Sequence, residues 1–259
     1  MKRIFIISCI ISCMYPVAFA TTFEGAISEI GKTNSNVVID KRTNKAISGA
    51  KVYIPKLQYS TTTNENGVFK LNTNISGTSI LAVEKENYRP FSTTIDKLSS
   101  HSPLTLGIEK TNTNDVVIDK DIYHIGDDNY SDLSANAGQF NLKSIGAFYT
   151  KMFDIKNVDI SKPIYFVIGS IIGIDTAIAR SMGQNKITNS YASPPEVYFN
   201  GNKVAEIELN GDNQKIKLPT NLVRPNSKNE ITIKAGRNIF QTAYIDYDDI
   251  EFMNLSIEN

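Results

Sequence analysis

Two Asn-Gly pairs, each flanked by short runs of alternating apolar and polar residues, constrain the fold of this chain most. The pairs are Asn200–Gly201 and Asn210–Gly211. Alternation with a period of two is typical of strands that bury one face. An Asn-Gly pair between two such runs predicts a tight hairpin, because a type I′ turn needs positive φ at both central residues. The alternating apolar residues are Val197 and Phe199, Ile207 and Leu209, Ile216 and Leu218, and Ile231 and Ile233. We therefore predict an antiparallel β unit over residues 195–259.

The first twenty residues have the pattern of a signal peptide. Basic residues at positions 2 and 3 precede a mostly apolar run, and Ala18–Ala20 supplies the small residues that stand before a cleavage site. We predict cleavage after Ala20. The alternative is lipidation at Cys13, because the four residues that end there resemble a lipobox. The apolar run is short for a membrane span. We expect an exported chain that is periplasmic, cell-surface or secreted, with no transmembrane segment after cleavage.

Cysteine content and charge exclude several classes of function. Both cysteines, Cys9 and Cys13, lie in the predicted signal segment, so a chain cut after Ala20 has no thiol for disulfides, catalysis or metal binding. The whole chain has 27 basic and 27 acidic residues, and loss of Lys2 and Arg3 leaves 25 against 27, a net charge of −2. A basic excess is the footprint of nucleic-acid binding, so we predict no nucleic-acid partner.

Residues 36–110 alternate short apolar runs with turn-forming clusters. Val37–Ile39 and Ile80–Val83 are predicted strands, and Asn64–Gly67 is a predicted turn. Short strands at regular spacing, separated by turn signals, are typical of a small β-sandwich.

Two motifs in this region resemble the carboxypeptidase regulatory-like domain. They are Ile47-Ser48-Gly49-Ala50-Lys51-Val52 and Thr63-Asn64-Glu65-Asn66-Gly67-Val68-Phe69, and Tyr88 follows them. The resemblance implies a prealbumin-like β-sandwich that is non-catalytic and often accompanies enzymes or surface proteins. No zinc peptidase pattern accompanies it, because neither His101 nor His124 stands in an H-x-x-E arrangement.

A polar joint, Thr111–Asp115, separates this region from a second apolar-patterned region over residues 115–259. Four elements of the second region together resemble galactose-binding-like jelly rolls of the carbohydrate-binding-module type. These elements are Gly126–Tyr130, the hairpin at Asn200–Gly201, the predicted strand Asn229–Ile233 and the closing run Asp246–Phe252. The resemblance implies a larger β-sandwich and sugar binding. We therefore predict an all-β chain of two sandwiches, a small prealbumin-like one and a larger jelly roll.

Carboxylates are concentrated at both ends of the second domain. Ca²⁺ takes six to eight oxygen ligands, and the first and last strands can be neighbours in the jelly rolls that this domain resembles. We therefore predict a calcium site. If the closing run is a strand, Asp246 and Asp248 face one side of the sheet. Asp249 and Glu251 then face the other side. The predicted ligands are Asp127, Asp128, Asp246 and Asp248. The alternative is that these are ordinary solvated or hydrogen-bonded groups.

Sugar rings often stack on flat aromatic side chains. The chain has no tryptophan, which leaves Tyr130, Tyr191, Tyr198 and Tyr244 as candidate ligand-binding residues. Each has the alternative of packing in the core or at a rim. Paired carboxylates also serve glycoside hydrolysis, but no nucleophile motif accompanies His124 and the small sandwich lacks extended loops. We predict no catalytic residue.

These observations predict an exported, non-catalytic binding protein. Its second domain is expected to recognise a glycan or a protein surface. The alternative is a structural or assembly subunit of an envelope complex, with no small-molecule site.

Overall fold

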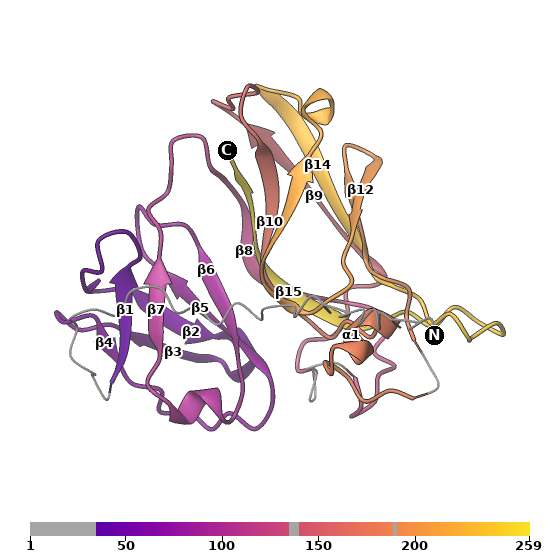
Figure 1. Ribbon diagram of the computed structural model, residues 1–259, viewed down its shortest axis with the longest axis horizontal. Coiled ribbons are helices and arrows are strands. Elements are labelled where there is room, and N and C mark those ends of the chain that lie inside the picture. Colours follow the sequence, from indigo (N-terminus) through magenta and orange to yellow (C-terminus); the bar gives the residue numbers. More distant parts are fainter. Residues whose placement is uncertain (1–34, 135–139, 189–190) are drawn as a thin grey trace, which may run out of the picture. The chain divides into compact units, whose positions relative to one another are not determined.

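The computed structural model describes residues 35–134, 140–188 and 191–259. These residues fall within one compact unit, 34–259, and nearly all of their regular structure is β-strand (Figure 1). The predicted all-β fold class is therefore confirmed. The predicted signal segment, with its cleavage point and Cys13, lies outside the described residues. In the described part of the chain, no helix is both long and apolar enough to cross a bilayer.

The first sandwich packs a three-stranded sheet, ordered β4-β1-β7, against a four-stranded sheet, ordered β3-β2-β5-β6. β1 pairs with β7 in parallel and with β4 in the antiparallel sense. Apolar residues that alternate along the strands, such as Val52 and Ile54, are fully buried between the sheets. The strands are β1 (Asn36–Asp40), β2 (Lys51–Ile54), β3 (Tyr59–Thr62), β4 (Val68–Phe69), β5 (Ser79–Glu84), β6 (Phe91–Ile95) and β7 (Thr105–Ile108), with 3₁₀ turns η1 (Pro55–Leu57) and η2 (Ser99–His101).

The predicted turn at Asn64–Gly67 is present and is held by its own first residue. The Asn64 side-chain oxygen accepts hydrogen bonds from the backbone N–H groups of Asn66 (3.0 Å) and Val68 (2.9 Å). Asparagine side chains favour turns because they bond their own backbone in this way.

The second sandwich contains two four-stranded antiparallel sheets, ordered β13-β10-β15-β8 and β12-β11-β14-β9. Its first strand lies beside its last, and the chain passes between the sheets as it does in an eight-stranded jelly roll. The strands are β8 (Val116–Ile125), β9 (Phe148–Ile155), β10 (Ile164–Ile172), β11 (Glu196–Phe199), β12 (Asn202–Glu206), β13 (Gly211–Leu218), β14 (Ser227–Lys234) and β15 (Ile250–Glu258). A short helix, α1 (Ala177–Ser181), and a 3₁₀ turn, η3 (Thr220–Leu222), lie in the connections.

The first Asn-Gly pair forms the predicted hairpin between β11 and β12. Asn200 and Gly201 have φ angles of 49° and 79°, both positive as a type I′ turn requires. The Asn200 side chain also accepts a hydrogen bond from the Glu230 N–H (2.9 Å) and donates to the Leu222 carbonyl (2.7 Å). The turn is thus tied to the neighbouring strand.

The second Asn-Gly pair does not form a hairpin, and the strand predicted through Ile207 and Leu209 is wrong. β12 ends at Glu206, and β13 pairs with β10 in the opposite sheet. Residues 207–210 carry the chain between the sheets. The Asn210 side chain accepts from the Ile174 N–H (2.8 Å) and donates to the Ile174 carbonyl (3.1 Å), so it fixes this crossing to the end of β10.

The polar joint between the sandwiches, Thr111–Asp115, is held in place by hydrogen bonds to the Asp115 side chain. The Asp115 carboxylate accepts hydrogen bonds from the Arg89 guanidinium at 2.6 and 3.0 Å and from the Asn112 N–H at 2.8 Å. Further along, the Asp212 carboxylate accepts from the Thr94 N–H (3.0 Å) of β6. Bidentate Arg–carboxylate pairs are among the stronger polar contacts in proteins.

A buried carboxylate, Asp119, joins β8 to β9 in the second sandwich. Its Oδ2 accepts hydrogen bonds from Tyr123 (2.8 Å), Tyr149 (2.8 Å) and Lys151 (2.9 Å). Burial alone would raise the pKa of Asp119, but these bonds and one from the Asp121 N–H hold that pKa below its usual value. The ionised carboxylate therefore stabilises the native state.

We expect an Asp119→Asn variant to lose about 2 kcal/mol of stability at pH 7, because a hydrogen-bonded charge becomes neutral. The loss should become smaller in acid. A depressed native pKa adds stability above the unfolded pKa of about 3.9 and loses it as pH falls through the lower native value. Urea unfolding of both proteins at pH 7 and near pH 3 measures this. Asp154→Asn, which alters an exposed pair with Lys228, is the control. An equal loss at both pH values would contradict a role for the charge.

Candidate functional site

A pocket of about 370 Å³ opens where β8 ends and β15 begins. No Lys or Arg stands among the described residues that line it, and its volume is in the range of small-molecule sites. Its carboxylates are Asp175, Asp246, Asp248 and Asp249. Two amides, Asn129 and Asn238, and two aromatic rings, Tyr130 and Tyr247, also line it. We call it the acidic pocket.

The pairing of the first and last strands creates this pocket. β8 and β15 are antiparallel neighbours, with Ile125 opposite Ile250 and His124 opposite Glu251. The loop that leaves β8 and the loop that enters β15 therefore emerge side by side. This confirms the expectation that the two ends of the domain meet.

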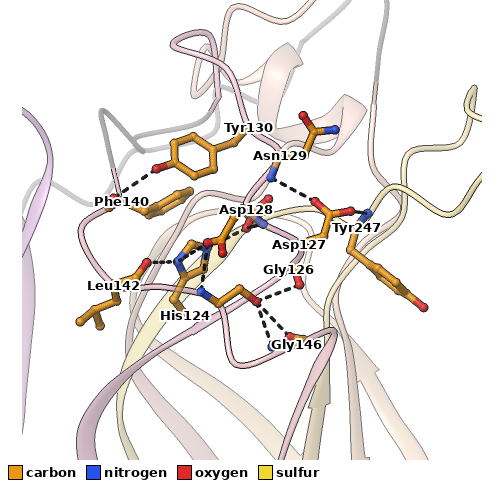
Figure 2. A network of polar contacts seen from close by, with 12 residues as sticks. His124, Gly126, Asp127, Asp128, Asn129, Tyr130, Phe140, Leu142, Gly146 and Tyr247 are labelled. Atoms are coloured by element: carbon orange, nitrogen blue, oxygen red, sulfur yellow. Dashed lines mark hydrogen bonds and ion pairs between the residues drawn. The ribbon is translucent and has the colours of Figure 1, made fainter.

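Asp127 ties the two loops together. Its carboxylate accepts hydrogen bonds from the Tyr247 N–H (2.9 Å) and the Asn129 N–H (3.1 Å), as Figure 2 shows. Burial raises the pKa of Asp127, and the nearby charges of Asp249 and Asp246 act in the same direction. Asp127 is not among the residues that line the pocket, so it positions the loops.

Asp128 also shapes the loops from outside the pocket. It has a φ of 63°, and its N–H donates to Asp249 Oδ1 (2.9 Å) while its carboxylate accepts from the Ser144 N–H (3.0 Å). Of the four predicted metal ligands, the structure therefore places Asp246 and Asp248 on the pocket wall. Asp127 and Asp128 are exposed and do not line the pocket.

Asp246 and Asp248 differ in the hydrogen bonds that their carboxyl oxygens accept. Asp246 accepts from the side-chain amides of Asn129 (3.0 Å) and Asn238 (2.9 Å), one on each oxygen. Asp248 accepts from the Asp175 N–H (3.1 Å). Burial, together with the charge of Asp175, raises the pKa of Asp248 well above its usual value. A carboxylate in this position favours a proton or another cation.

Asp249 is the most enclosed carboxylate of the pocket. Its Oδ1 accepts from His124 Nε2 (2.8 Å) and the Asp128 N–H, but its Oδ2 is buried with no hydrogen-bond partner among the described residues. Sequence reasoning missed Asp249 because it assumed an extended strand from Asp246 onwards. β15 begins only at Ile250, so the alternation of sides does not apply to the preceding loop.

His124 holds the Asp249 carboxylate, and both of its ring nitrogens face hydrogen-bond acceptors. Its Nδ1 lies 2.6 Å from the Leu142 carbonyl oxygen (Figure 2). Its Nε2 lies 2.8 Å from Asp249 Oδ1. Burial alone would lower the pKa of His124, but the hydrogen bonds to Asp249 and Leu142 raise it. The geometry fits an imidazolium that donates from both nitrogens. Although His124, Asp128 and Asp249 lie close enough to hold a metal ion, a ring with two donated protons has no lone pair for one.

The four predicted tyrosines do not form one platform. Tyr130 lines the acidic pocket, and its hydroxyl donates to the Phe140 carbonyl (3.1 Å). Tyr191 lies against the side chains of Arg180 and Phe240. Tyr198 lies on the outer side of β11, with the Lys234 ammonium 4.2 Å from its ring centre. Tyr244 is 57% exposed in the loop before β15. Tyr247 lines the pocket and carried no distinguishing sequence signal.

Comparison with known proteins supports the first domain. Residues 35–118 match the CarboxypepD_reg-like domain family, which covers the predicted region 36–110. This domain is non-catalytic, has an immunoglobulin-like fold and often occurs in surface proteins. The match does not extend over the jelly roll. A comparison with curated proteins finds no match to the chain.

Proposed function

We propose that this chain is an exported, non-catalytic binding protein that recognises a neutral glycan in the acidic pocket of its second sandwich. The observation that carries the proposal is a pocket of small-molecule size lined by carboxylate and amide groups, with an aromatic ring at its wall. Sugar hydroxyls donate hydrogen bonds to carboxylate oxygens, and such charge-assisted bonds are strong. The ring of Tyr130 offers a flat apolar face for a sugar ring.

The charge of the pocket narrows the class of ligand. Four carboxylates and no basic side chain in the described lining disfavour phosphate, sulfate and acidic sugars, because like charges repel. Neutral and cationic groups remain. Phosphoryl or carboxylate recognition would call for an arginine or lysine at the wall.

We propose that Ca²⁺ also binds in this pocket. Asp249 Oδ2 is a buried carboxylate oxygen without a hydrogen-bond partner among the described residues, and Asp248 stands beside Asp175. Hard cations prefer such oxygen ligands. Asp248 and Asp249 are the proposed ligands, and a cation there would offset the repulsion among the carboxylates.

The His124–Asp249 pair supports a non-catalytic role. A general base needs a free lone pair within reach of a proton, whereas both nitrogens of His124 face acceptors. The nearby Ser144 hydroxyl donates to the Gly126 carbonyl (2.8 Å). The pair is therefore best explained as support for the Asp249 carboxylate.

A second candidate function is recognition of a protein surface within an envelope assembly. The observation that favours it is the loop before β15, where Ile239, Phe240 and Ile245 are 56–60% exposed. A partner that presents a lysine or arginine between apolar residues would complement both this loop and the acidic pocket.

A glycan array probed with the mature chain, in calcium and in chelator, tests the glycan proposal. We expect specific binding to neutral glycans, and an Asp248→Asn variant should bind at least tenfold more weakly because one carboxyl oxygen that accepts hydrogen bonds is replaced by an amide NH₂. Asp154→Asn changes a carboxylate on β9, outside the pocket, and should bind like the parent chain. An array with no specific binder in either buffer would contradict the glycan proposal and leave the protein-surface candidate.

A further inference from the structure

A second hollow, of about 530 Å³, lies beside the acidic pocket. It is formed mainly by the loop of residues 237–246, which runs between β14 and β15, together with Ser193. In Figure 1 this loop is the yellow segment that precedes β15 along the chain. We call this hollow the loop hollow.

Two residues line both hollows, and we call this pair the ridge. Asn238 and Asp246 line the acidic pocket and the loop hollow alike. The Asn238 side-chain amide donates to Asp246 Oδ2 (2.9 Å), and its backbone N–H donates to the Asp246 carbonyl (2.8 Å). Asn129 holds the other oxygen of Asp246. The ridge is therefore a fixed feature, and a ligand that crosses it contacts both hollows at once.

The two hollows differ in chemistry. The acidic pocket offers mainly acceptors, which suit sugar hydroxyl donors. The loop hollow adds Arg237 and Gln241 as donors, and it adds the ring of Tyr244, which is 57% exposed. An exposed tyrosine ring beside polar donors is suited to stack on a sugar ring whose oxygens accept hydrogen bonds.

We propose that the acidic pocket and the loop hollow are two subsites of one groove, so that the ligand is an oligosaccharide chain and not a single sugar. This inference rests on the proposed glycan function. One sugar unit occupies the acidic pocket, the chain crosses the ridge of Asn238 and Asp246, and a later unit stacks on Tyr244. The ridge residues are positioned to bind the linkage region.

Affinity as a function of chain length tests this proposal. The probes are five neutral series, each from one to six units: α-1,4-glucose, β-1,4-glucose, β-1,4-xylose, β-1,4-mannose and β-1,4-N-acetylglucosamine. Calorimetric titration of the mature chain should show, in the series that binds, an affinity that rises at least tenfold between one unit and four. A Tyr244→Ala variant should lose about fivefold in affinity for four or more units and keep the affinity for one unit.

The matched control is Phe148→Ala, which removes an equally exposed ring (60%) on β9, away from both hollows. It should leave all affinities unchanged. Melting temperatures of both variants should equal that of the parent chain, because neither ring is buried. If one unit binds as tightly as six, or if Tyr244→Ala weakens all lengths equally, the two-subsite groove is wrong and the glycan function stands. If no series binds at any length and the array also finds no binder, the glycan function itself fails.

Discussion

A Gly126→Ala variant is expected to lose about 3 kcal/mol of stability, which lowers Tm by about 6–12 °C for a chain of this size. Gly126 has a φ of 146°, and a Cβ added there would lie 2.3 Å from Asp249 Oδ1 and 2.8 Å from the Asp249 Cα. The Asp249 backbone cannot move aside easily, because its side chain is held by His124 and by the Asp128 N–H. Thermal unfolding followed by circular dichroism measures the loss.

The control for this prediction separates the clash from backbone strain. Gly146 also has a positive φ, 112°, but a Cβ there would meet no atom within 4 Å. Gly146→Ala should therefore cost only the strain of that conformation, about 1 kcal/mol. Equal losses in the two variants would mean that Asp249 does not pack against Gly126 as described.

The contrast between the two Asn-Gly pairs shows what a local sequence pattern can and cannot predict. Asn200–Gly201 forms the predicted turn because the strands on both sides pair with each other. Asn210–Gly211 has the same residues, yet the following strand pairs with β10, more than forty positions earlier. A turn signal describes the backbone over a few residues. The choice of partner strand depends on contacts distant in sequence, which a pattern of period two does not contain.

The candidate site could also be predicted only in part, because its composition depends on contacts between residues distant in sequence. The expectation that the first and last strands of the domain are neighbours is confirmed by the pairing of β8 with β15. Which carboxylates face the pocket depended on where β15 begins. A start at Ile250 leaves Asp246–Asp249 in a loop, so Asp248 and Asp249 both reach the wall. Asp175, which follows β10, had no sequence signal, because only the fold brings it beside Asp248.

The tyrosines illustrate a further limit. Residue type alone made all four equally suitable as platforms, but exposure and neighbours separate them. Tyr198 is engaged by Lys234 and Glu196 on the outside of its sheet, and Tyr191 by Arg180. Of these four, Tyr130 and Tyr244 line the hollows of the proposed groove.

Calcium is expected to raise the Tm of a chain that spans residues 21–259, relative to its Tm in chelator. A ligand that binds only the native state stabilises it by mass action, by about 4 kcal/mol when its concentration is a thousand times Kd. The physical reason is the crowding of carboxylates: each close pair of charges repels by about 1 kcal/mol even in water, and by more where water is excluded. The measurement is thermal unfolding in calcium, in magnesium and in chelator. Magnesium should have a smaller effect, because it requires a tighter octahedral set of ligands.

An Asp248→Asn variant gives this prediction its sharpest form, because the expected effect changes sign with the buffer. The asparagine oxygen can still accept the hydrogen bond from the Asp175 N–H, so the local fold is retained. In chelator the variant should melt above the parent chain, since a half-buried carboxyl crowded by the charge of Asp175 is replaced by a neutral amide. In calcium it should melt below the parent chain, since one ligand of the cation is gone. Asp154→Asn should follow the parent chain in both buffers. A Tm that chelator leaves unchanged would contradict the calcium proposal. A variant that melts lower by the same amount in both buffers would instead identify Asp248 as a purely structural acceptor.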